Sequence, residues 1–348
     1  MTRASVIIPC HNKSGTLALV VDSVLRQTVQ DLEVLMLGDG VTDEARAAIL
    51  ELVAADERVR FLDFPKGPHH GEAYRHDAVL AASSDAIFYL CDDDLLLPEH
   101  VSDLLALLED ANVVQSLGSY IRPDGRFGSY AGDLADAELV AAVLDESIRF
   151  NFVSITGTAH SKSYYLETGA HWETTPDGIW PDHHEFRKLA RHPGYRGATS
   201  HRVTALQLPT TNDGREDWTA EERVAELARW HAVVVAPDGQ EQVDALHHQG
   251  LISDVARLRL LESRLTQDVD FALTQNAHQK RDFERHVEIL QGDFENYLRE
   301  LEVVHNEREQ ELARRQQRQR RLRRDLTAAQ RELETLRARA DRPWWRRG

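Results

Sequence analysis

A buried apolar run that ends in three consecutive carboxylates most constrains the fold of this chain. Residues Ala86–Cys91 are continuously apolar or aromatic, which is typical of a strand buried on both faces. Asp92, Asp93 and Asp94 follow directly, and Pro98 predicts the start of a helix. Adjacent carboxylates repel one another and are costly to desolvate. Two interpretations stay open here: a site for Mg²⁺ or Mn²⁺ that holds a substrate's phosphates, or a solvated acidic loop beside a helix N-terminus.

Strands and helices alternate through the first 90 residues. Three further strands are predicted at Ser5–Pro9, Leu32–Leu37 and Val59–Phe64, and each is followed by a predicted helix. This alternation predicts right-handed βαβ units and a parallel sheet. Such sheets bind ligands beyond the carboxyl ends of their strands, where the sequence places Asn12, Asp39 and the three aspartates. We therefore expect these side chains to share one rim of the sheet.

The rest of the chain predicts shorter elements and then long helices. They are a helix at Glu99–Glu109, strands at Val113–Tyr120, Phe150–Thr158 and His201–Leu208, short helices at Lys162–Thr168 and from Trp180 to Arg191, and helices at 216–236 and 239–262. The domain limits that we expect are an α/β domain at 1–215, a helical extension at 216–254 and a coiled coil with a basic tail at 255–348.

Composition and charge narrow the class of protein. The formal net charge of −17 argues against general nucleic-acid binding. The two cysteines, Cys10 and Cys91, exclude a disulfide framework and fit a reducing compartment. No apolar run approaches the roughly 18–20 residues of a membrane span, and the N-terminal run is too short for a signal peptide. These features predict a soluble, cytoplasmic protein.

Apolar residues near the C-terminus recur with spacings of three and four, the pattern of a coiled coil. They are Val287, Leu290, Phe294, Tyr297, Leu301 and Val304, and Leu326, Ala329, Leu333 and Leu336 resume the pattern after an Arg-rich stretch at 314–324. A solvated single helix is the alternative. We favour a homo-oligomer, most simply a dimer, because the apolar seam otherwise faces water.

The C-terminal tail is basic although the chain as a whole is acidic. From Arg308 to Gly348 there are 14 Arg against 6 acidic residues, and Pro343–Arg347 reads PWWRR. Trp beside Arg is typical of a membrane–water interface, so peripheral contact with anionic lipid at the inner face of the membrane is one expectation. The alternatives are pairing with the acidic domain and a solvated tail. A role in nucleic-acid binding is disfavoured because no aromatic stacking platform accompanies the arginines.

Four sequence blocks within the first 210 residues resemble the family 2 glycosyltransferases, which have the GT-A fold. They are SVIIPCHNKSGTLALVVDSVLRQT, LMLGDGVTD, FYLCDDDLLLPEHV and PDHHEFRKLA. The resemblance implies an α/β, Rossmann-like domain with a mostly parallel sheet and flanking helices. It also implies transfer of a sugar from a nucleotide diphosphate sugar to a glycan or lipid-linked acceptor. Gly38 and Pro181 stand where the family commonly has acids, and the acids after Cys91 are consecutive rather than spaced.

The resemblance also implies a role for individual residues. Those expected to bind the nucleotide sugar are Pro9, Asn12, Asp39, Arg75 and Asp92, those expected to bind Mg²⁺ or Mn²⁺ are Asp93 and Asp94, and the expected catalytic base is Asp182.

Glycosyl transfer needs these groups for two reasons. A divalent cation can neutralise the leaving diphosphate, and a carboxylate can accept the proton of the incoming hydroxyl. One base opposite the leaving group implies inversion, since no second carboxylate is evident as a nucleophile. Residues His183–Glu185, beside Asp182, have two interpretations. They form a metal-binding cluster, or they shape the acceptor pocket or are solvated. Trp172 and Trp180 are expected to stack on an acceptor sugar or to pack in the domain.

Two other functions compete with this interpretation. The first is a catalytically silent GT-A-like scaffold whose coiled coil mediates assembly, which the acids at Asp39, Asp92–Asp94 and Asp182 disfavour. The second is a nucleotidyltransferase, which normally needs a Gly-rich phosphate loop after the first strand; CHNKSG fits that requirement poorly.

Overall fold

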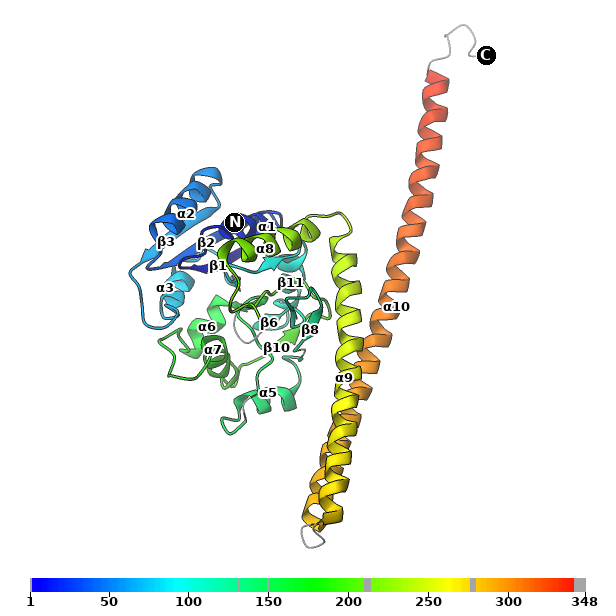
Figure 1. Cartoon of the computed structure of the whole chain (residues 1–348). Helices are drawn as coiled ribbons and strands as arrows, with labels where there is room; N and C mark the ends of the chain where they lie inside the picture. Colours follow the sequence, from blue (N-terminus) through cyan, green and yellow to red (C-terminus); the bar gives the residue numbers. More distant parts are fainter. Residues whose placement is uncertain (1, 131, 149, 210–213, 276–279, 341–348) are drawn as a thin grey trace. The chain divides into compact units, whose positions relative to one another are not determined.

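The computed structural model describes residues 2–340 except 131, 149, 210–213 and 276–279. The chain divides into two compact units, Met1–Ala256 and Arg257–Gly348 (Figure 1). The helices predicted as an extension at 216–254 lie within the first unit. The tail Pro343–Arg347 lies outside the described residues.

A seven-stranded, mostly parallel sheet forms the centre of the first unit. Its strand order is β10 (Gly197–Thr199), β6 (Val113–Gln115), β9 (Thr158–Ser161), β4 (Ala86–Tyr89), β1 (Ala4–Cys10), β2 (Leu32–Asp39) and β3 (Val59–Phe64). Strand β1 pairs in parallel with β2 and β4, while β9 runs antiparallel to both β4 and β6. The prediction of a mostly parallel α/β sheet with flanking helices is confirmed.

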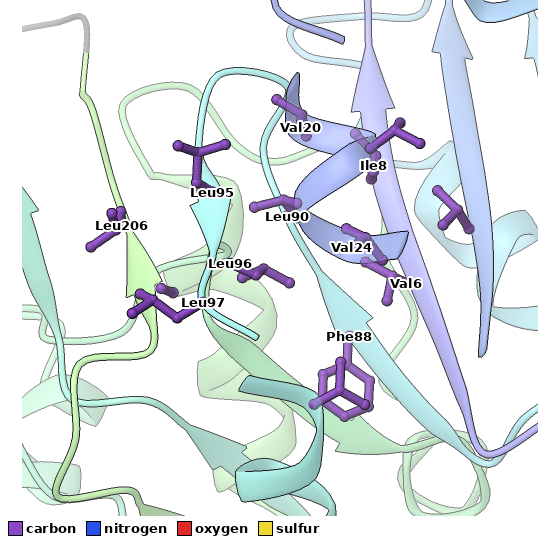
Figure 2. Close-up of a cluster of buried hydrophobic side chains, with 14 of the residues drawn as sticks. Val6, Ile8, Val20, Val24, Phe88, Leu90, Leu95, Leu96, Leu97 and Leu206 are labelled. Carbon is purple, nitrogen blue, oxygen red and sulfur yellow. The ribbon is translucent and has the colours of Figure 1, made fainter. Parts of the chain in front are cut away.

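Successive side chains of a strand point to opposite faces of the sheet, so a hydrophobic core forms on each face. Val6 and Ile8 of β1 belong to the cluster in Figure 2, and Ile7 belongs to the second cluster. The first cluster takes apolar residues from helices α1 (Leu17–Leu25), α2 (Asp43–Ala55), α4 (His100–Leu107) and α8 (Ala220–Val234). The second takes them from α3 (Tyr74–Ala81), α5 (Ala137–Leu144), α6 (Lys162–Thr168) and α7 (Pro181–Ala190).

Two small antiparallel pairs complete the first unit. Strand β5 (Leu95–Leu96) pairs with β11 (Ala205–Leu206), and β7 (Ser119–Ile121) pairs with β8 (Phe127–Ser129). The former pair closes over the first core, where Leu95, Leu96, Leu97 and Leu206 are buried (Figure 2). The apolar residues that follow the three aspartates, Leu95–Leu97, therefore belong to the core.

Three predicted strands are shorter than expected because their backbones leave the sheet. The strand expected at Val113–Tyr120 breaks after Gln115, where Ser116 and Leu117 donate to the carbonyls of Gly157 and Arg202. The stretch at 150–157 is buried in part, at Phe152 and Val153, but has no ladder partner among the described residues and joins the sheet from Thr158. Likewise, only Ala205–Leu206 of the expected strand at 201–208 forms a ladder, and Gln207 makes an isolated bridge to Tyr120.

The C-terminal region is helical, as predicted. Helix α9 (Gly239–Gln275) continues from the first unit into the second, and α10 (Lys280–Ala340) follows. Within the second unit, Arg259 of α9 lies 4.0 Å from Glu302 of α10. Several residues of the predicted seam are half-buried in the single chain, namely Val287, Phe294, Leu301 and Val304, whereas Leu290 and Tyr297 are exposed. Oligomerisation through this region stays a prediction.

None of the described helices combines the length and apolar character that a bilayer crossing requires.

Candidate active site

A cavity of about 740 Å³ opens where β1, β2 and β4 reach their carboxyl ends. It brings together seven of the eight residues that the sequence singled out, namely Pro9, Asn12, Asp39, Arg75, Asp92, Asp93 and Asp182. Asp94 is the exception and does not line the cavity. The convergence follows from topology, because consecutive parallel strands present their following loops at one edge of the sheet.

Asp39 ends β2 and is held by the segment after β3. Its Oδ2 accepts from Lys66 Nζ at 2.6 Å and its Oδ1 accepts from the Gly67 amide at 2.7 Å. A carboxylate has about four acceptor sites, so the oxygens can still accept from a ligand. Gly71, at a φ of +62°, fits because a Cβ there would lie 2.3 Å from Asp39 Cγ. The carboxylate therefore has a fixed position at the rim.

Asp92 and Asp93 share one ammonium group. Lys13 Nζ lies 2.9 Å from Asp92 Oδ1 and 2.8 Å from Asp93 Oδ2. Burial raises the pKa of Asp92, although the attraction of Lys13 opposes this shift. Burial also opposes the charged form of Lys13, but attraction to both carboxylates raises its pKa on balance. A second cation, Arg223 from α8, places Nη2 3.1 Å from Asp93 Oδ2.

Asp94 is buried and links its own turn to two other loops through hydrogen bonds. Its Oδ2 accepts from Thr156 Oγ1 at 2.6 Å, and its Oδ1 accepts from the Leu208 amide at 2.8 Å. Burial, together with repulsion from Asp93, raises the pKa of Asp94 to about 7. These bonds fix the turn that presents Asp92 and Asp93 to the cavity. Metal binding by Asp94 stays a prediction.

Whether the carboxylates suit a divalent cation depends on how many protein ligands the ion needs. Among the described residues there is no group of three or more His, Cys, Asp or Glu side chains arranged to hold a metal. Mg²⁺, however, is commonly bound by one or two carboxylates together with substrate phosphates and water. Asp92 and Asp93 supply two hard oxygen ligands around one cationic centre, so the donor set fits Mg²⁺ or Mn²⁺ bound with a diphosphate.

Arg75 is a buried cation on the cavity wall. It is 7% exposed, and its guanidinium carbon lies 4.6 Å from the centroid of the Trp172 ring. Its Nε has no hydrogen-bond partner among the described residues, as is expected of a donor that awaits a ligand. Burial lowers the pKa of Arg75, but a guanidinium keeps its charge at neutral pH.

Trp172 packs against Arg75 and is buried, and hydrogen bonds hold its indole ring in place. Its Nε1 donates to the Tyr89 hydroxyl at 2.8 Å, and this hydroxyl lies 2.8 Å from His160 Nε2. Of the two tryptophans that the sequence singled out, Trp172 is 6% exposed and packs in the domain. Trp180 lines the cavity and is 48% exposed.

Asp182 lies in the first turn of α7, after Pro181 at the first helical position. The backbone amide of His183 donates to Asp182 Oδ1 at 2.8 Å. Burial raises the pKa of Asp182, while that hydrogen bond and Arg75 act in the opposite direction. A carboxylate with a raised pKa is a stronger proton acceptor, which suits a general base.

The histidines beside Asp182 have other partners. His183 Nε2 lies 3.2 Å from the Val143 carbonyl oxygen, and His184 Nε2 lies 3.1 Å from Glu173 Oε1. The described residues therefore give no support to the metal cluster considered at 183–185.

Sequence reasoning named Arg75 but missed the cations that contact the aspartates of the site. Lys13 lies in the block HNK after β1, and Lys66 follows β3 at the same rim, so extending the strand-end rule to basic residues would have found both. Arg223 gave no comparable signal, because it reaches Asp93 from a helix 130 residues further along the chain.

Comparisons with known proteins relate part of this chain to glycosyltransferases. Residues 5–158 match the model of Glycosyl transferase family 2. An uncharacterized glycosyltransferase of Rickettsia felis is 31% identical over 119 residues, which cover 34% of this chain and 19% of that protein. A GalNAc(5)-diNAcBac-PP-undecaprenol beta-1,3-glucosyltransferase of Campylobacter jejuni is 27% identical over 108 residues, which cover 30% of this chain and 34% of that protein.

A crystal structure of S. aureus TarS in complex with UDP-GlcNAc has a TM-score of 0.47 and 15% identity, covering 72% of this chain and 71% of that chain. The match to R. felis spans about a fifth of that relative's length. The matched segment contains β1 to β4, the loop of Lys13 and all three consecutive aspartates. By this match, residues 5–158 are similar to Glycosyl transferase family 2.

Proposed function

We propose that the first unit is a metal-dependent, inverting glycosyltransferase. It moves a sugar from a nucleotide diphosphate donor to a hydroxyl group of a glycan or lipid-linked acceptor. The observation that carries the proposal is the meeting of Asp39, Asp92, Asp93, Arg75 and Asp182 around one cavity of about 740 Å³. No two of these groups except the adjacent aspartates are close in sequence, so their convergence is a property of the fold.

The donor's nucleoside lies between the ends of β1 and β2 in this proposal. Asp39, fixed by Lys66 and Gly67, accepts a hydrogen bond from a ring N–H of the base, and Pro9 packs against the base. Asn12 and Asp92 lie beside this position and contact the ribose. Polar groups fixed before binding reduce the entropic cost of ordering the site around its ligand.

The diphosphate faces the carboxylate pair. Asp92 and Asp93 hold Mg²⁺ or Mn²⁺, which when bound offsets the negative charge of the departing nucleoside diphosphate. Arg75 adds a fixed positive charge, and its Nε, which has no partner among the described residues, can donate to the phosphate or to the sugar. A guanidinium suits phosphate oxygens because of its planar array of donors.

Asp182 accepts the proton of the acceptor hydroxyl. Its position at the start of α7, on the same cavity as the diphosphate site, supports attack on the face of the sugar opposite the leaving group. Direct displacement from that face inverts the configuration of the anomeric carbon. Burial of Asp182 favours acceptance of the proton by raising its pKa.

The acceptor enters beside Trp180. This half-exposed indole lines the cavity next to Pro181 and Asp182, and an aromatic face stacks readily on the apolar face of a sugar ring. The Campylobacter relative acts, by its name, on an undecaprenol diphosphate-linked glycan, which supports a lipid-linked acceptor for this chain.

The test is turnover against a panel of nucleotide sugars, with Mg²⁺, with Mn²⁺ and with a chelator. At least one donor should be hydrolysed or transferred in a metal-dependent manner. Asp93→Asn keeps the shape of the side chain and removes the charge, so it should lose the metal-dependent turnover. Equal turnover in the chelator and in Mn²⁺ would contradict metal dependence, and no turnover of any donor would favour the silent scaffold.

A further inference from the structure

The ammonium group of Lys13 contacts both Asp92 and Asp93, the two carboxylates that would hold a metal ion. Its ammonium nitrogen lies 2.9 Å from Asp92 Oδ1 and 2.8 Å from Asp93 Oδ2. The backbone around it is fixed by Thr16, whose hydroxyl is within hydrogen-bond reach of both the Lys13 and the Asp92 carbonyl oxygens. The loop after β1 and the aspartate turn are thus joined at the point where the ammonium sits.

The second cation on this pair is held differently. Arg223 contacts Asp93 but does not line the cavity, and its Nη1 lies 3.0 Å from Glu226 Oε2. Glu226 is itself fixed by a buried ion pair with Arg215, at 2.6 Å. Lys13, by contrast, lines the cavity, and 40% of its side chain is exposed. Of the two cations, Lys13 is the one with access to a ligand and with room to move.

A divalent ion and an ammonium group cannot share the same two oxygens. Like charges held this close repel one another strongly, because the effective dielectric constant near a protein surface is well below that of water. The four-carbon stem of lysine lets its ammonium move by several ångströms while the backbone stays in place. The donor's diphosphate, which enters with the metal, offers the displaced ammonium a new anionic partner in the same cavity.

We propose that Lys13 is an exchangeable counterion of the carboxylate pair. It neutralises Asp92 and Asp93 before the donor binds, yields them to the divalent cation, and then pairs with the diphosphate. This inference rests on the proposed function and adds a positioning role for a residue that the family resemblance did not assign.

The exchange has a thermodynamic signature. Without a diphosphate, Lys13 competes with the metal, so its charge weakens metal binding. With the metal bound, the same charge strengthens diphosphate binding. Neutralising Lys13 must therefore shift the two affinities in opposite directions, which a merely structural role does not do.

The experiment measures both affinities in Lys13→Met. Free Mn²⁺ is followed by electron paramagnetic resonance during titration of the protein without nucleotide, and inorganic pyrophosphate is then titrated calorimetrically in excess Mn²⁺. We expect Mn²⁺ to bind about tenfold more tightly to Lys13→Met than to the wild type, and pyrophosphate about tenfold more weakly. Lys13→Arg keeps the charge and should resemble the wild type in both titrations.

Arg26→Met is the matched control, because it removes one positive charge from the exposed end of α1, away from the cavity. Both of its affinities should equal those of the wild type. Equal Mn²⁺ affinity in Lys13→Met and wild type, with both folded by circular dichroism, overturns the exchange and leaves the proposed function intact. Weaker Mn²⁺ binding by Lys13→Met also overturns it. If the wild-type protein binds neither Mn²⁺ alone nor pyrophosphate in excess Mn²⁺, the metal-dependent function itself is overturned.

Discussion

The guanidinium of Arg75 rests on the indole ring of Trp172, with 4.6 Å between the guanidinium carbon and the ring centroid. The two residues come from α3 and from the loop before α7, and they are nearly 100 positions apart in the chain. Trp172 is itself hydrogen-bonded to Tyr89. The contact therefore holds the guanidinium of Arg75 on the cavity wall with little freedom to turn. Donor affinity should therefore depend on a tryptophan that does not reach the donor.

Replacing this indole should weaken donor binding. Cation–π contacts are worth about 0.5–2 kcal/mol, so Trp172→Leu should lower the affinity for the nucleotide sugar by roughly twofold to thirtyfold. Isothermal titration calorimetry measures the change. Trp180→Leu is the control, since Trp180 is exposed at the cavity and should affect the acceptor rather than the donor. Equal donor affinity in Trp172→Leu and wild type would show that Arg75 is positioned by other contacts.

Removing the proposed base should slow transfer and leave binding unchanged. Asp182→Asn should lower kcat by about 10²–10⁴, the usual contribution of a general base, with the donor Kd preserved. Since burial raises the pKa of Asp182, wild-type activity should fall on the acid side at a higher pH than for an ordinary carboxylate. Glu185→Gln, a buried neighbour on the same helix, should keep most of the activity. If Asp182→Asn transfers sugar normally, the base lies elsewhere.

Stability should depend on pH through His100. This buried side chain lies 2.8 Å from Thr204 Oγ1, and burial lowers the pKa of His100 to about 3. A depressed pKa contributes stability above the unfolded value near 6.5, and this contribution is lost as the pH falls towards 3. One such group accounts for a slope of at most about 1.4 kcal/mol per pH unit.

The variant His100→Asn keeps a polar partner for Thr204 and cannot take up the proton. Its free energy of unfolding, measured with urea between pH 7 and pH 4, should fall less steeply than that of the wild type. All other titrating groups are common to both proteins, so the difference isolates His100. If the free energy of unfolding falls equally steeply with pH in both proteins, the pKa of His100 is not lowered in the folded protein.

The helical region should mediate self-association. Leu290 and Tyr297, which are 49% and 43% exposed, leave part of the predicted seam uncovered in the single chain. We expect the full-length protein to be an oligomer, most simply a dimer, and a chain that ends at Ala256 to be a monomer that still binds the donor. Light scattering at micromolar concentration distinguishes the two states, and a monomeric full-length protein would refute the prediction.

A belt of arginines on α10 should bind anionic membrane surfaces. All its members are exposed, and they are Arg314, Arg315, Arg318, Arg320, Arg321, Arg323 and Arg324. Each basic residue near such a surface contributes about 1 kcal/mol, and salt weakens the attraction. In co-sedimentation, the full chain should pellet with anionic vesicles and not with neutral vesicles. A chain ending at Arg308 should stay in the supernatant, and equal recovery of both proteins there would contradict the expectation.

Local patterns in the sequence determined the framework of the domain. Apolar runs of strand length located β1, β2 and β4, because a strand buried on both faces is largely apolar. Strand β3, at an edge of the sheet, carries Arg60 and Asp63 and was located by the alternation of strands and helices. The loops that follow parallel strands meet at one edge, so the positions of Asp39 and Asp92 could be inferred without a structure. The family motifs added Arg75 and Asp182, whose positions on helices carry no local sign of a shared cavity.

Only the tertiary structure decided which side chains meet. Asp92 to Asp94 are identical in type and adjacent in sequence, yet Asp94 is bound by Thr156 and Leu208 while its neighbours share Lys13. Arg223 reaches Asp93 because α8 packs on α1, a contact between segments some 200 residues apart. Periodicity specifies the face on which a residue lies, but its partner on that face depends on the packing of segments distant in sequence.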